Sequence, residues 1–436
     1  MGILFGHGGH RSGPSHLGLI CSENHEGIVP STLRLLPDLQ SVSWTQVPIS
    51  NLRALDLDAT FRLNHGDDLP IASSNRVING QHRPPLEEEA TRIADSWKGP
   101  HSCEERYCVW SNTGFSGQGM SIVTTMANHQ RVERLPKVTA RLEGASSHFL
   151  LAAVPGKGLG LIATRKIRRG ERIMAVQPAI LVHLKFIEES ELEDQYRLLE
   201  LAVNKLPTAR KDSFMAQAGD LGGHRISDVI FTNSFQMSLG EEDGFHLGNF
   251  PEVSRFNHDC RPNVAFYIDN NLTHHTHAVR DIHPGEELSI SYLDSFQARS
   301  VRQERARASW GFSCSCSQCS LSKTEADASD ARLFSIYQIE NEISDFSNQE
   351  ASPALVERLI SLYREERLEF RIAGAYTIAA LKYNLFGKAK LAKKYAELAV
   401  EAGIIENGPD AADVRAMREL ADDPKGHWSW NQKPRR

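Results

Sequence analysis

The sequence predicts an α+β protein in which a region of short β strands is followed by an all-helical C-terminal region. Residues 146–183 contain β-type apolar segments separated by glycine-containing turns. After a helical pattern at 186–220, strand-like segments return at 263–268, 274–279 and 288–292. From about residue 330, apolar residues recur at helical spacing almost to the end of the chain. Strands that come before a run of helices are typical of an α+β fold.

The composition is that of an ordinary globular protein, with 436 residues of which 40% are hydrophobic and 24% charged. The formal net charge of -6 argues against phosphate-driven contacts, so no direct nucleic-acid binding is expected. No stretch has the roughly 18–20 apolar residues needed to span a bilayer, and the opening residues are not typical of a secretory signal. We therefore expect an intracellular monomer without membrane attachment, in the nucleus, the cytoplasm or both.

The chain is divided into five expected regions: 1–100, 101–145, 146–295, 296–325 and 326–436. Shifts in composition and periodicity mark the first two and the last, and the motifs described below mark the third and the fourth. The first is rich in Gly, Pro, Ser, His and Asn, so we expect it to be largely disordered apart from a short helix near 87–97. The second is expected to be a short β-rich extension with strands at 108–110 and 120–125. Its sequence echoes the stretch after Phe149; chance similarity is the favoured interpretation of this echo, and an extra hairpin beside the main sheet is the alternative. The third contains a helical insert at 184–225.

The last region is expected to be built from amphipathic helices at 332–343, 353–369, 373–385 and 389–403. The helix pair around Phe386 and Gly387 resembles a tetratricopeptide-type hairpin. With so few repeats, this region is expected to be a packing domain rather than a long solenoid. Before it, the arginine-rich helix at 299–310 is expected to be solvent-exposed, with Glu304 interleaved among its arginines.

Seven cysteines are present, an odd number, and this favours metal ligation in a reducing compartment over a disulfide framework. Three of them fall within six residues: Cys314, Cys316 and Cys319. A structural zinc site needs four ligands, and Cys260 is the natural candidate for the fourth. Cys103 and Cys108 remain alternatives, either as the fourth ligand or as a separate weak site. The competing interpretations are three unrelated thiols, or a Cys-Cys pair with spare partners.

The run VPGKGLGLIAT places Gly156, Gly158 and Gly160 in one turn. Glycine allows positive φ angles and close approach of a ligand to the backbone. A dinucleotide-binding turn would need a helix directly after the loop, whereas a strand and another turn follow here. Alone, the run is consistent with a plain β turn. It indicates a function only in combination with the motifs that follow.

Directional polar side chains are concentrated in the stretch SRFNHDCRPN, residues 254–263. Asn257 and His258 offer hydrogen bonds suited to an amine, a carboxylate or an adenine edge. A polar turn with a satisfied histidine is the alternative. Further on, HPGEELSISYLD predicts a turn into a strand that ends at Tyr292, where core packing is the alternative role for the tyrosine.

Taken together, these motifs resemble the SET domain in order and spacing, over about residues 146–320. The G-x-G element is met at 158–160, and the NHxCxPN core at 257–263. GEEL followed by a tyrosine is met at 285–292, and the post-SET C-x-C-x2-C pattern at 314–319. The resemblance implies short β sheets with a pseudoknot, an S-adenosylmethionine-dependent protein lysine methyltransferase, and structural zinc held by Cys260, Cys314, Cys316 and Cys319.

Within this family the chain is similar to the SET-and-MYND group, because residues 226–237 and the helical C-terminal region resemble theirs. No cysteine occurs in the insert, so the MYND finger is absent and functions that depend on it are not carried over. Trp310 stands where relatives often carry a tyrosine at the target-lysine channel. Ile290 stands where the family often has Phe or Tyr, which favours room for more than one methyl group.

The resemblance implies a set of cofactor-binding residues: Lys157, Gly158, Leu159, Gly160, Asn233, Asn257, His258, Tyr292 and Phe312. The glycine loop is expected to line the methionine end of the cofactor through its backbone. Asn233 is expected to contact the polar end and Asn257 the methionine moiety. His258 and Phe312 are expected to meet the adenine. Tyr292 is expected to be the catalytic hydroxyl at the methyl-transfer centre.

The implied reaction is an in-line transfer from a sulfonium to the neutral lysine amine of a protein substrate, histone or non-histone. Zinc is expected to be structural, because four cysteines leave no open coordination position. Glu286 and Glu287 are expected to hold their turn rather than do chemistry. The alternative is a catalytically inactive SET protein that acts as a scaffold through its helical C-terminal domain. The presence of Asn257, His258 and Tyr292 argues for activity.

Overall fold

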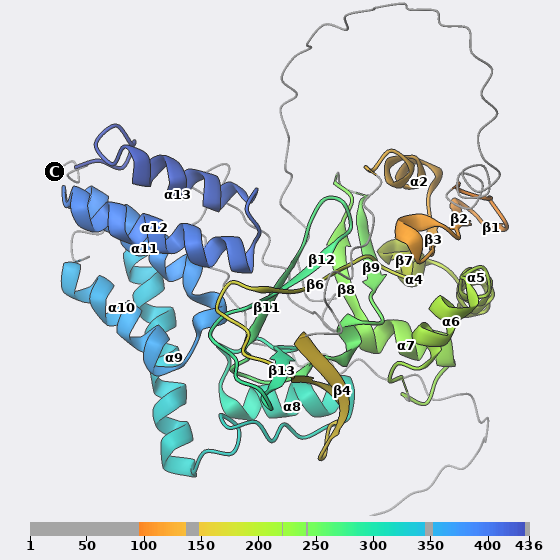
Figure 1. Ribbon diagram of the computed structural model, residues 1–436, viewed down its shortest axis with the longest axis horizontal. Helices are drawn as coiled ribbons and strands as arrows, with labels where there is room; N and C mark the ends of the chain where they lie inside the picture. Colours follow the sequence, from red (N-terminus) through yellow and green to blue (C-terminus); the bar gives the residue numbers. More distant parts are fainter. Residues whose placement is uncertain (1–95, 137–147, 220, 241–242, 345–351, 432–436) are drawn as a thin grey trace, which may run out of the picture. The chain divides into compact units, whose positions relative to one another are not determined.

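The computed structural model describes residues 96–136, 148–219, 221–240, 243–344 and 352–431 (Figure 1). Nearly all of the region predicted to be disordered, and the helix expected near 87–97 up to residue 95, lie outside these residues. The described residues form three β sheets and a C-terminal set of helices, which confirms the predicted α+β class.

A six-stranded sheet has the strand order β1-β2-β3-β7-β9-β8. Its strands are β1 (Cys103–Glu104), β2 (Tyr107–Asn112), β3 (Met120–Thr124), β7 (Ile180–His183), β8 (Ser234–Ser238) and β9 (Phe245–Asn249). The two strands expected in the extension are present as β2 and β3, which pair with each other, and β3 also pairs in parallel with β7. The extension is therefore part of this sheet rather than a hairpin laid beside another one. Helix α2 (Met126–Glu133) and the 3-10 turn η3 (Phe115–Gly117) flank β3.

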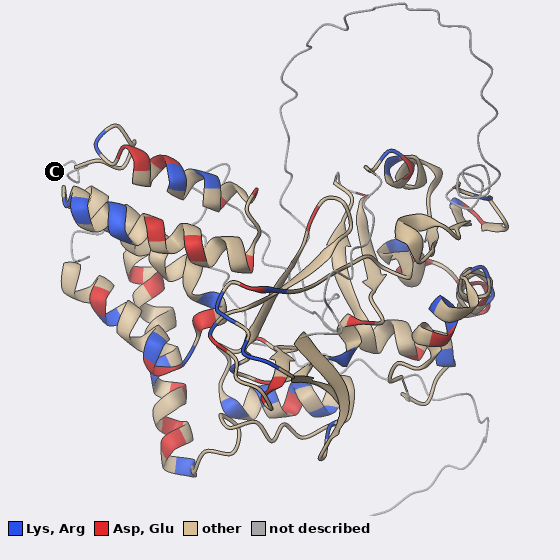
Figure 2. Cartoon of the chain, viewed as in Figure 1, with Lys and Arg blue, Asp and Glu red and all other residues tan. Residues whose placement is uncertain are grey.

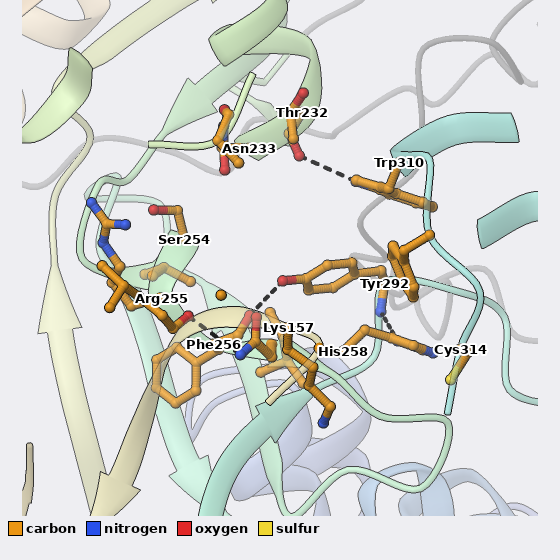
Figure 3. Close-up of a pocket in the computed structure, with 18 of the residues that line it drawn as sticks. Lys157, Thr232, Asn233, Ser254, Arg255, Phe256, His258, Tyr292, Trp310 and Cys314 are labelled. Atoms are coloured by element: carbon orange, nitrogen blue, oxygen red, sulfur yellow. Dashed lines mark hydrogen bonds between the residues drawn. The ribbon is translucent and has the colours of Figure 1, made fainter. Parts of the chain in front are cut away.

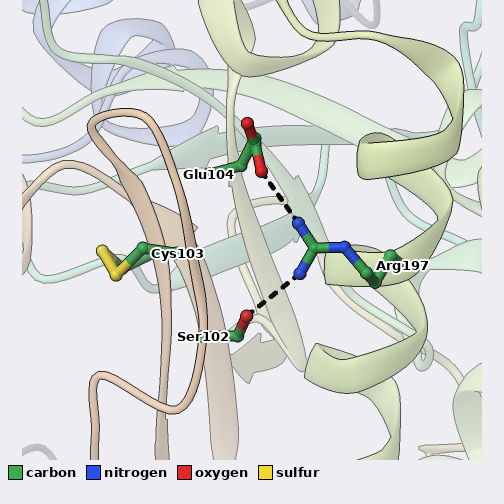
Figure 4. Close-up of a disulfide and its surroundings, with 5 residues drawn as sticks. Ser102, Cys103, Glu104 and Arg197 are labelled. Carbon is green, nitrogen blue, oxygen red and sulfur yellow. Dashed lines mark hydrogen bonds and ion pairs between the residues drawn. A yellow bond between two sulfur atoms is a disulfide. The ribbon is translucent and has the colours of Figure 1, made fainter.

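Cys103 and Cys108 form a disulfide across the β1–β2 hairpin, which corrects the expectation that they are thiols available to a metal. The two residues lie directly opposite each other in the hairpin register, so their side chains are brought within bonding reach. Arg197 of the neighbouring helix fixes this hairpin, donating to Ser102 Oγ at 3.0 Å and pairing with Glu104 at 2.9 Å (Figure 4). The turn that creates this register was not visible in the cysteine spacing.

A second sheet, in the order β10-β13-β5-β4, carries most of the predicted motifs. Its strands are β4 (Phe149–Val154), β5 (Gly158–Ala163), β10 (Asn257–His258) and β13 (Glu287–Ile290). The glycine run forms the β4–β5 turn, and β10 pairs in parallel with β13. The sheet therefore places the Asn-His segment beside the strand that leads to Tyr292. The short turn η4 (Val253–Arg255) precedes β10.

The third sheet is antiparallel and contains β6 (Arg172–Val176), β12 (His274–Ala278) and β11 (Val264–Ile268). The last part of the β-type region expected at 146–183 is divided between β6 and β7, which lie in different sheets. Pro178 lies between the two strands, where its missing N–H would interrupt a continuous strand ladder.

The region expected as a helical insert contains α4 (Leu184–Glu189), α5 (Leu192–Asn204) and α6 (Thr208–Met215), and α7 (Arg225–Asn233) follows. The apolar side of α5, with Leu198, Leu199 and Ala202, packs with Val229 of α7 in one buried core. Val109 and Val123 of the six-stranded sheet belong to the same core. This packing fixes the position of α7, whose last residue is Asn233.

The C-terminal helices are α8 (Arg299–Trp310), α9 (Lys323–Ser344), α10 (Pro353–Glu365), α11 (Ile372–Leu385), α12 (Ala389–Glu406) and α13 (Ala412–Asp422), with η5 (Glu369–Arg371) before α11. The predicted helices are confirmed, but α9 starts earlier than expected and α13 was not predicted. The early start has a local cause, because Ser322 and Glu325 form a reciprocal capping box. Helix α9 thus begins four residues after Cys319.

The helices α9 to α13 share a core that also includes Ala265 of β11 and Val279 just after β12. Helices α9, α10, α12 and α13 carry charged residues of both signs (Figure 2). Among the described helices, none has the length and apolar content that a membrane crossing requires.

The exposed helix expected at 299–310 is only partly confirmed. Arg305 and Arg307 of α8 are exposed, whereas Arg302 is buried with 1% of its surface exposed. Burial works against its charge, but the neighbouring Cys260 and Cys319 sulfurs raise the pKa of Arg302. The helix pattern could not reveal which arginine faces the cysteine cluster, because that depends on how the cluster folds back onto the helix.

Buried histidines predict a loss of stability in acid. His274 lies among the rings of Phe235, Phe250 and Phe266, and burial lowers its pKa from 6.5 to about 3. Below pH 6.5 the unfolded chain binds a proton at this site and the folded chain does not, so the free energy of unfolding decreases toward pH 3. We expect His274→Leu to remove about 2–3 kcal/mol of this decrease at pH 4.5. Urea unfolding at pH 7.5 and 4.5 measures it, and an equal decrease in both proteins would contradict it.

Candidate active site

A cavity of about 360 Å³ lies where the glycine loop, the Asn-His segment and the residues after α8 meet (Figure 3). This volume falls within the roughly 300–1,000 Å³ typical of small-molecule sites. Of the predicted cofactor-binding residues, all except Gly160 line it. The lining also includes residues that the sequence did not single out for binding: Thr232, Phe235, Arg255 and Phe256. Trp310 and Ile290, noted as departures from the family, line it too.

The glycines of the β4–β5 turn are needed for two different reasons. Gly156 and Gly158 have φ angles of +73° and +76°, a backbone conformation that other residues rarely adopt. At Gly160 the requirement is space, because a Cβ would lie 2.7 Å from Asn257 Nδ2 and 2.8 Å from Val154 Cγ2. Asn257 Nδ2 donates to Leu159 O at 3.3 Å, so the asparagine side chain crosses the loop at Gly160.

Gly160→Ala is therefore expected to weaken S-adenosylmethionine binding by about tenfold, because the added methyl group displaces the Asn257 side chain. Gly374→Ala is the matched control: Gly374 lies in the first turn of α11, and its added Cβ meets nothing within 4 Å beyond its neighbours in the helix. That substitution should leave binding unchanged and stabilise the fold by about 0.5–1 kcal/mol. Calorimetric titration measures the affinities, and unchanged binding by Gly160→Ala would show that the loop does not need this space.

Glu287 lies beneath the glycine loop. Its Oε1 accepts from Asn257 Nδ2 at 2.9 Å, and its Oε2 pairs with Lys157 Nζ at 2.7 Å. It thus ties the glycine loop to the Asn-His segment, a role that the sequence did not predict. The register of β13 with β5 and β10 creates these contacts, and no local motif signals it. Glu286 does hold its turn, accepting from His283 N at 2.9 Å.

The ring of His258 is buried and fully engaged within the protein. Its Nδ1 accepts from Tyr292 N at 3.0 Å, so Nε2 carries the proton and points it at Cys260 Sγ, 3.3 Å away. Burial lowers the pKa of His258 to about 4, and the ring therefore stays neutral. Because both ring nitrogens are used, any contact of His258 with an adenine would involve its backbone. The ring connects Tyr292 to the cysteine cluster.

Tyr292 is half-enclosed by aromatic rings at the cavity wall. Its hydroxyl donates to Phe256 O at 2.6 Å, and its ring lies 5.5 Å from that of Trp310 and 5.4 Å from that of His258 (Figure 3). Burial raises the pKa of Tyr292, so the hydroxyl keeps its proton at neutral pH. The phenol oxygen is thus fixed in place, with lone pairs that can still accept a hydrogen bond.

Helix α7 closes the opposite side of the cavity. Asn233 Nδ2 donates to Ala218 O at 2.7 Å and to Val229 O at 2.8 Å, which leaves its carbonyl oxygen to face a ligand. Trp310 Nε1 donates to Thr232 O at 3.3 Å. The end of α8 is thereby joined to the end of α7 across the cavity.

Four buried cysteines form a cluster directly behind this cavity: Cys260, Cys314, Cys316 and Cys319. Their sulfur atoms all lie within 4.8 Å of one another, and Cys260 Sγ is 3.6 Å from Cys319 Sγ. Tetrahedral zinc with Zn–S bonds of about 2.3 Å places its sulfurs about 3.8 Å apart. The donor set and its spacing fit a structural zinc ion. Cys103 and Cys108 do not belong to the cluster, because they are joined to each other.

The cluster and the cavity share one segment of chain. Cys314 lines the cavity and belongs to the cluster, and Phe312 packs against the cluster while lining the cavity. Four thiolates and one Zn²⁺ carry a formal charge of about -2. The buried Arg302 guanidinium lies beside Cys260 and Cys319 and offsets part of this charge.

Sequence comparison indicates which known proteins are similar to this chain. The model of the SET-domain family matches residues 158–293. These residues therefore match a SET domain, and the chain is similar to proteins named as protein lysine methyltransferases.

Three relatives illustrate the comparison. Histone-lysine N-methyltransferase set5 of Schizosaccharomyces pombe is 27% identical over 286 residues, which cover 64% of this chain and 85% of the relative. N-lysine methyltransferase SMYD2 of Rattus norvegicus is 29% identical over 41% of this chain and 42% of its own length. Histone-lysine N-methyltransferase SMYD3 of Homo sapiens is 35% identical over 22% of this chain and 23% of its own length. The match thus spans less than half of the two animal relatives.

Proposed function

We propose that this chain transfers a methyl group from S-adenosylmethionine to the side-chain amine of a lysine in a protein substrate, histone or non-histone. The observation that carries the proposal is one cavity lined by the glycine loop, Asn257, Phe312 and the fixed hydroxyl of Tyr292. The relatives support the substrate class, because they are named as histone-lysine and N-lysine methyltransferases.

The residues around the cavity fit such a cofactor. Backbone groups of 156–159 and the carbonyl oxygen of Asn233 are available to polar atoms, and Phe312 offers an aromatic face to an adenine. The space kept open by Gly160 lets Asn257 hold the loop in this shape. When bound, S-adenosylmethionine supplies an electrophilic methyl group on its sulfonium.

The protein's own part in the reaction is to position and desolvate the lysine. Phe235, Phe256 and Trp310 give the cavity apolar walls, and burial between such walls lowers the pKa of an amine. A neutral amine has the lone pair that a nucleophile needs. The Tyr292 oxygen, fixed by its bond to Phe256 O, accepts a hydrogen bond from the amine and aims it. Positioning of this kind is worth several kcal/mol of barrier.

The cysteine cluster would hold zinc as a structural ion, since four thiolates fill a tetrahedral site. Its contribution would be to fix Phe312 and Cys314 at the cavity wall. Zinc binding and formation of the cofactor site would then be coupled.

A catalytically inactive scaffold, acting through the helical domain, is not favoured. Loss of the Asn-His pair or of the tyrosine would indicate an inactive protein. All three residues are present and line one cavity: Asn257, His258 and Tyr292. Protein binding through the helical domain would not require a fixed Tyr292 hydroxyl at a cavity large enough for a cofactor.

Calorimetric titration of the zinc-replete chain with S-adenosylmethionine tests the proposal. We expect micromolar binding by the wild type, and binding weakened by about 10–100-fold in Asn257→Ala, because the bonds to Leu159 and Glu287 are lost. Asn407→Ala is the control, since its amide bonds Asp413 within the helical domain, and it should bind normally. If zinc-replete wild-type protein fails to bind, the proposal is wrong and the scaffold interpretation is the one to pursue.

A further inference from the structure

The end of helix α10 contacts both segments that supply the clustered cysteines. Glu366 is the C-cap residue of this helix, and its side chain is 1% exposed. Cys260 comes from the Asn-His segment, whereas the other three cysteines come from the loop after α8. These two segments are more than fifty residues apart in sequence, and Glu366 lies near neither of them in the chain.

On the first segment, Glu366 binds the residue next to Cys260. Arg261 Nη2 donates to Glu366 Oε2 at 2.7 Å, and Arg261 Nε donates to the Glu366 carbonyl oxygen. The same guanidinium donates from Nη1 to Cys260 O at 2.8 Å. One carboxylate thus holds the backbone of a cysteine ligand through a single buried arginine.

On the second segment, Glu366 binds a residue between two cysteines. Gln318, which lies between Cys316 and Cys319, donates from Nε2 to Glu366 Oε2 at 3.3 Å and to Ser329 Oγ at 2.7 Å. Ser329 Oγ in turn donates to Glu366 Oε2 at 2.7 Å. The cysteine loop is therefore bound to the same carboxylate oxygen as Arg261.

The charges in this network favour an ionised Glu366. Burial works to raise its pKa, but hydrogen bonds from Arg261 and Ser329 and the charge of Arg261 hold it below the usual value. Arg332 of α9 adds a second cation, with its Nε 2.6 Å from Glu366 Oε1. Removing one member of a buried ion pair leaves the charge of the other uncompensated. The buried arginine that binds Glu366 therefore depends on this carboxylate.

We propose that Glu366 is a positioning residue through which the helical domain holds Cys260 and the 314–319 loop at metal-binding distance. Cys314 belongs to this loop and Phe312 lies two residues before it, and both line the cavity. The same carboxylate therefore also steadies the cofactor wall. Its effect on zinc does not depend on the proposed function, whereas its effect on cofactor binding rests on it.

The helical domain offers a matched control in the same helix. Glu357 of α10 accepts from Tyr383 Oη at 2.6 Å and from Tyr395 Oη at 2.9 Å, both within the helical domain. Glu357→Gln should disturb packing of the helices without touching the cysteine loop. It therefore separates a general loss of stability from a loss of positioning.

The experiment compares zinc-loaded full-length wild type, Glu366→Gln and Glu357→Gln. The rate of zinc transfer to a chromophoric chelator is the primary readout, and the dissociation constant for S-adenosylhomocysteine is the second. We expect Glu366→Gln to release zinc about tenfold faster or more and to bind S-adenosylhomocysteine more weakly. Glu357→Gln should melt at a lower temperature yet release zinc at the wild-type rate.

A second variant keeps the test decisive if Glu366→Gln does not fold. Arg367 donates to Gln318 Oε1 at 3.1 Å from a backbone with a φ of 53°, a conformation that asparagine tolerates. Arg367→Asn should accelerate zinc release by a smaller factor. The proposal would be overturned if Glu366→Gln and Arg367→Asn both released zinc at the wild-type rate. It would also be overturned if Glu357→Gln accelerated zinc release as much as Glu366→Gln, or if the wild type held no zinc. A wild type that holds zinc but binds no S-adenosylhomocysteine would instead refute the proposed function, while the zinc rates still decide the role of Glu366.

Discussion

Tyr292→Phe is expected to lower the rate of lysine methylation by about 10²–10³-fold while S-adenosylmethionine still binds. The substitution removes the oxygen that would accept a hydrogen bond from the lysine amine, and it leaves the ring in place among Trp310 and His258. The Phe256 carbonyl loses its donor, so a loss of about 1 kcal/mol in stability should accompany the change. Methylation rates at saturating cofactor, with calorimetric binding on the same samples, measure both effects.

Tyr383→Phe is the control for this substitution. Its hydroxyl donates to Glu357 Oε1 at 2.6 Å in the helical domain, so the variant also loses a partly buried hydroxyl bond. We expect its methylation rate to match the wild type despite a similar loss of stability. A Tyr292→Phe protein that keeps more than about half of the wild-type rate would remove the tyrosine from the proposed chemistry.

Loss of zinc is expected to have the second large effect. Without the ion, four thiol groups are left in contact in a buried cluster, and the wall that carries Phe312 loses its anchor. Cys316→Ser should hold well under one zinc per chain and bind S-adenosylmethionine more than about 100-fold more weakly. Its melting temperature should fall as well. Metal content by mass spectrometry and calorimetric binding are the measurements.

A Cys103→Ser and Cys108→Ser double variant is the control. It distinguishes the effect of losing a clustered cysteine from the effect of replacing cysteines elsewhere in the protein. These residues form a disulfide in the hairpin of the six-stranded sheet and contribute nothing to the cluster. The variant should keep one zinc and wild-type cofactor affinity. Full cofactor binding by a zinc-free Cys316→Ser protein would refute the coupling between metal and cavity.

Features encoded locally in the sequence were predictable. The glycine turn, the Asn-His pair and the Cys-x-Cys-x2-Cys run are short motifs, and the structure brings them around one cavity and one cluster. The strands at β4, β5, β11, β12 and β13 and the helices α8 to α12 follow from periodicity, which depends on neighbouring residues alone. The roles of individual residues toward a bound cofactor stay predictions.

Features that depend on contacts between distant segments were not predictable. The Cys103–Cys108 disulfide depends on a hairpin register, and the burial of Arg302 depends on the cluster that folds against it. Glu287 and Glu366 have their roles through partners 30 or more residues away. Helix α13 lies within the region expected to be helical almost to the end of the chain, but no separate helix was predicted after Asn407 and Gly408.

Transfer of an isotope-labelled methyl group tests the central claim most directly. Zinc-replete wild type and Tyr292→Phe would each be incubated with methyl-labelled S-adenosylmethionine and two substrate pools, core histones and an extract of soluble proteins. Mass spectrometry would then locate the label. The proposed function predicts labelled lysine side chains in at least one pool with wild type and none above background with Tyr292→Phe. Absence of lysine label with a wild type that binds the cofactor, or equal label with both proteins, would contradict it.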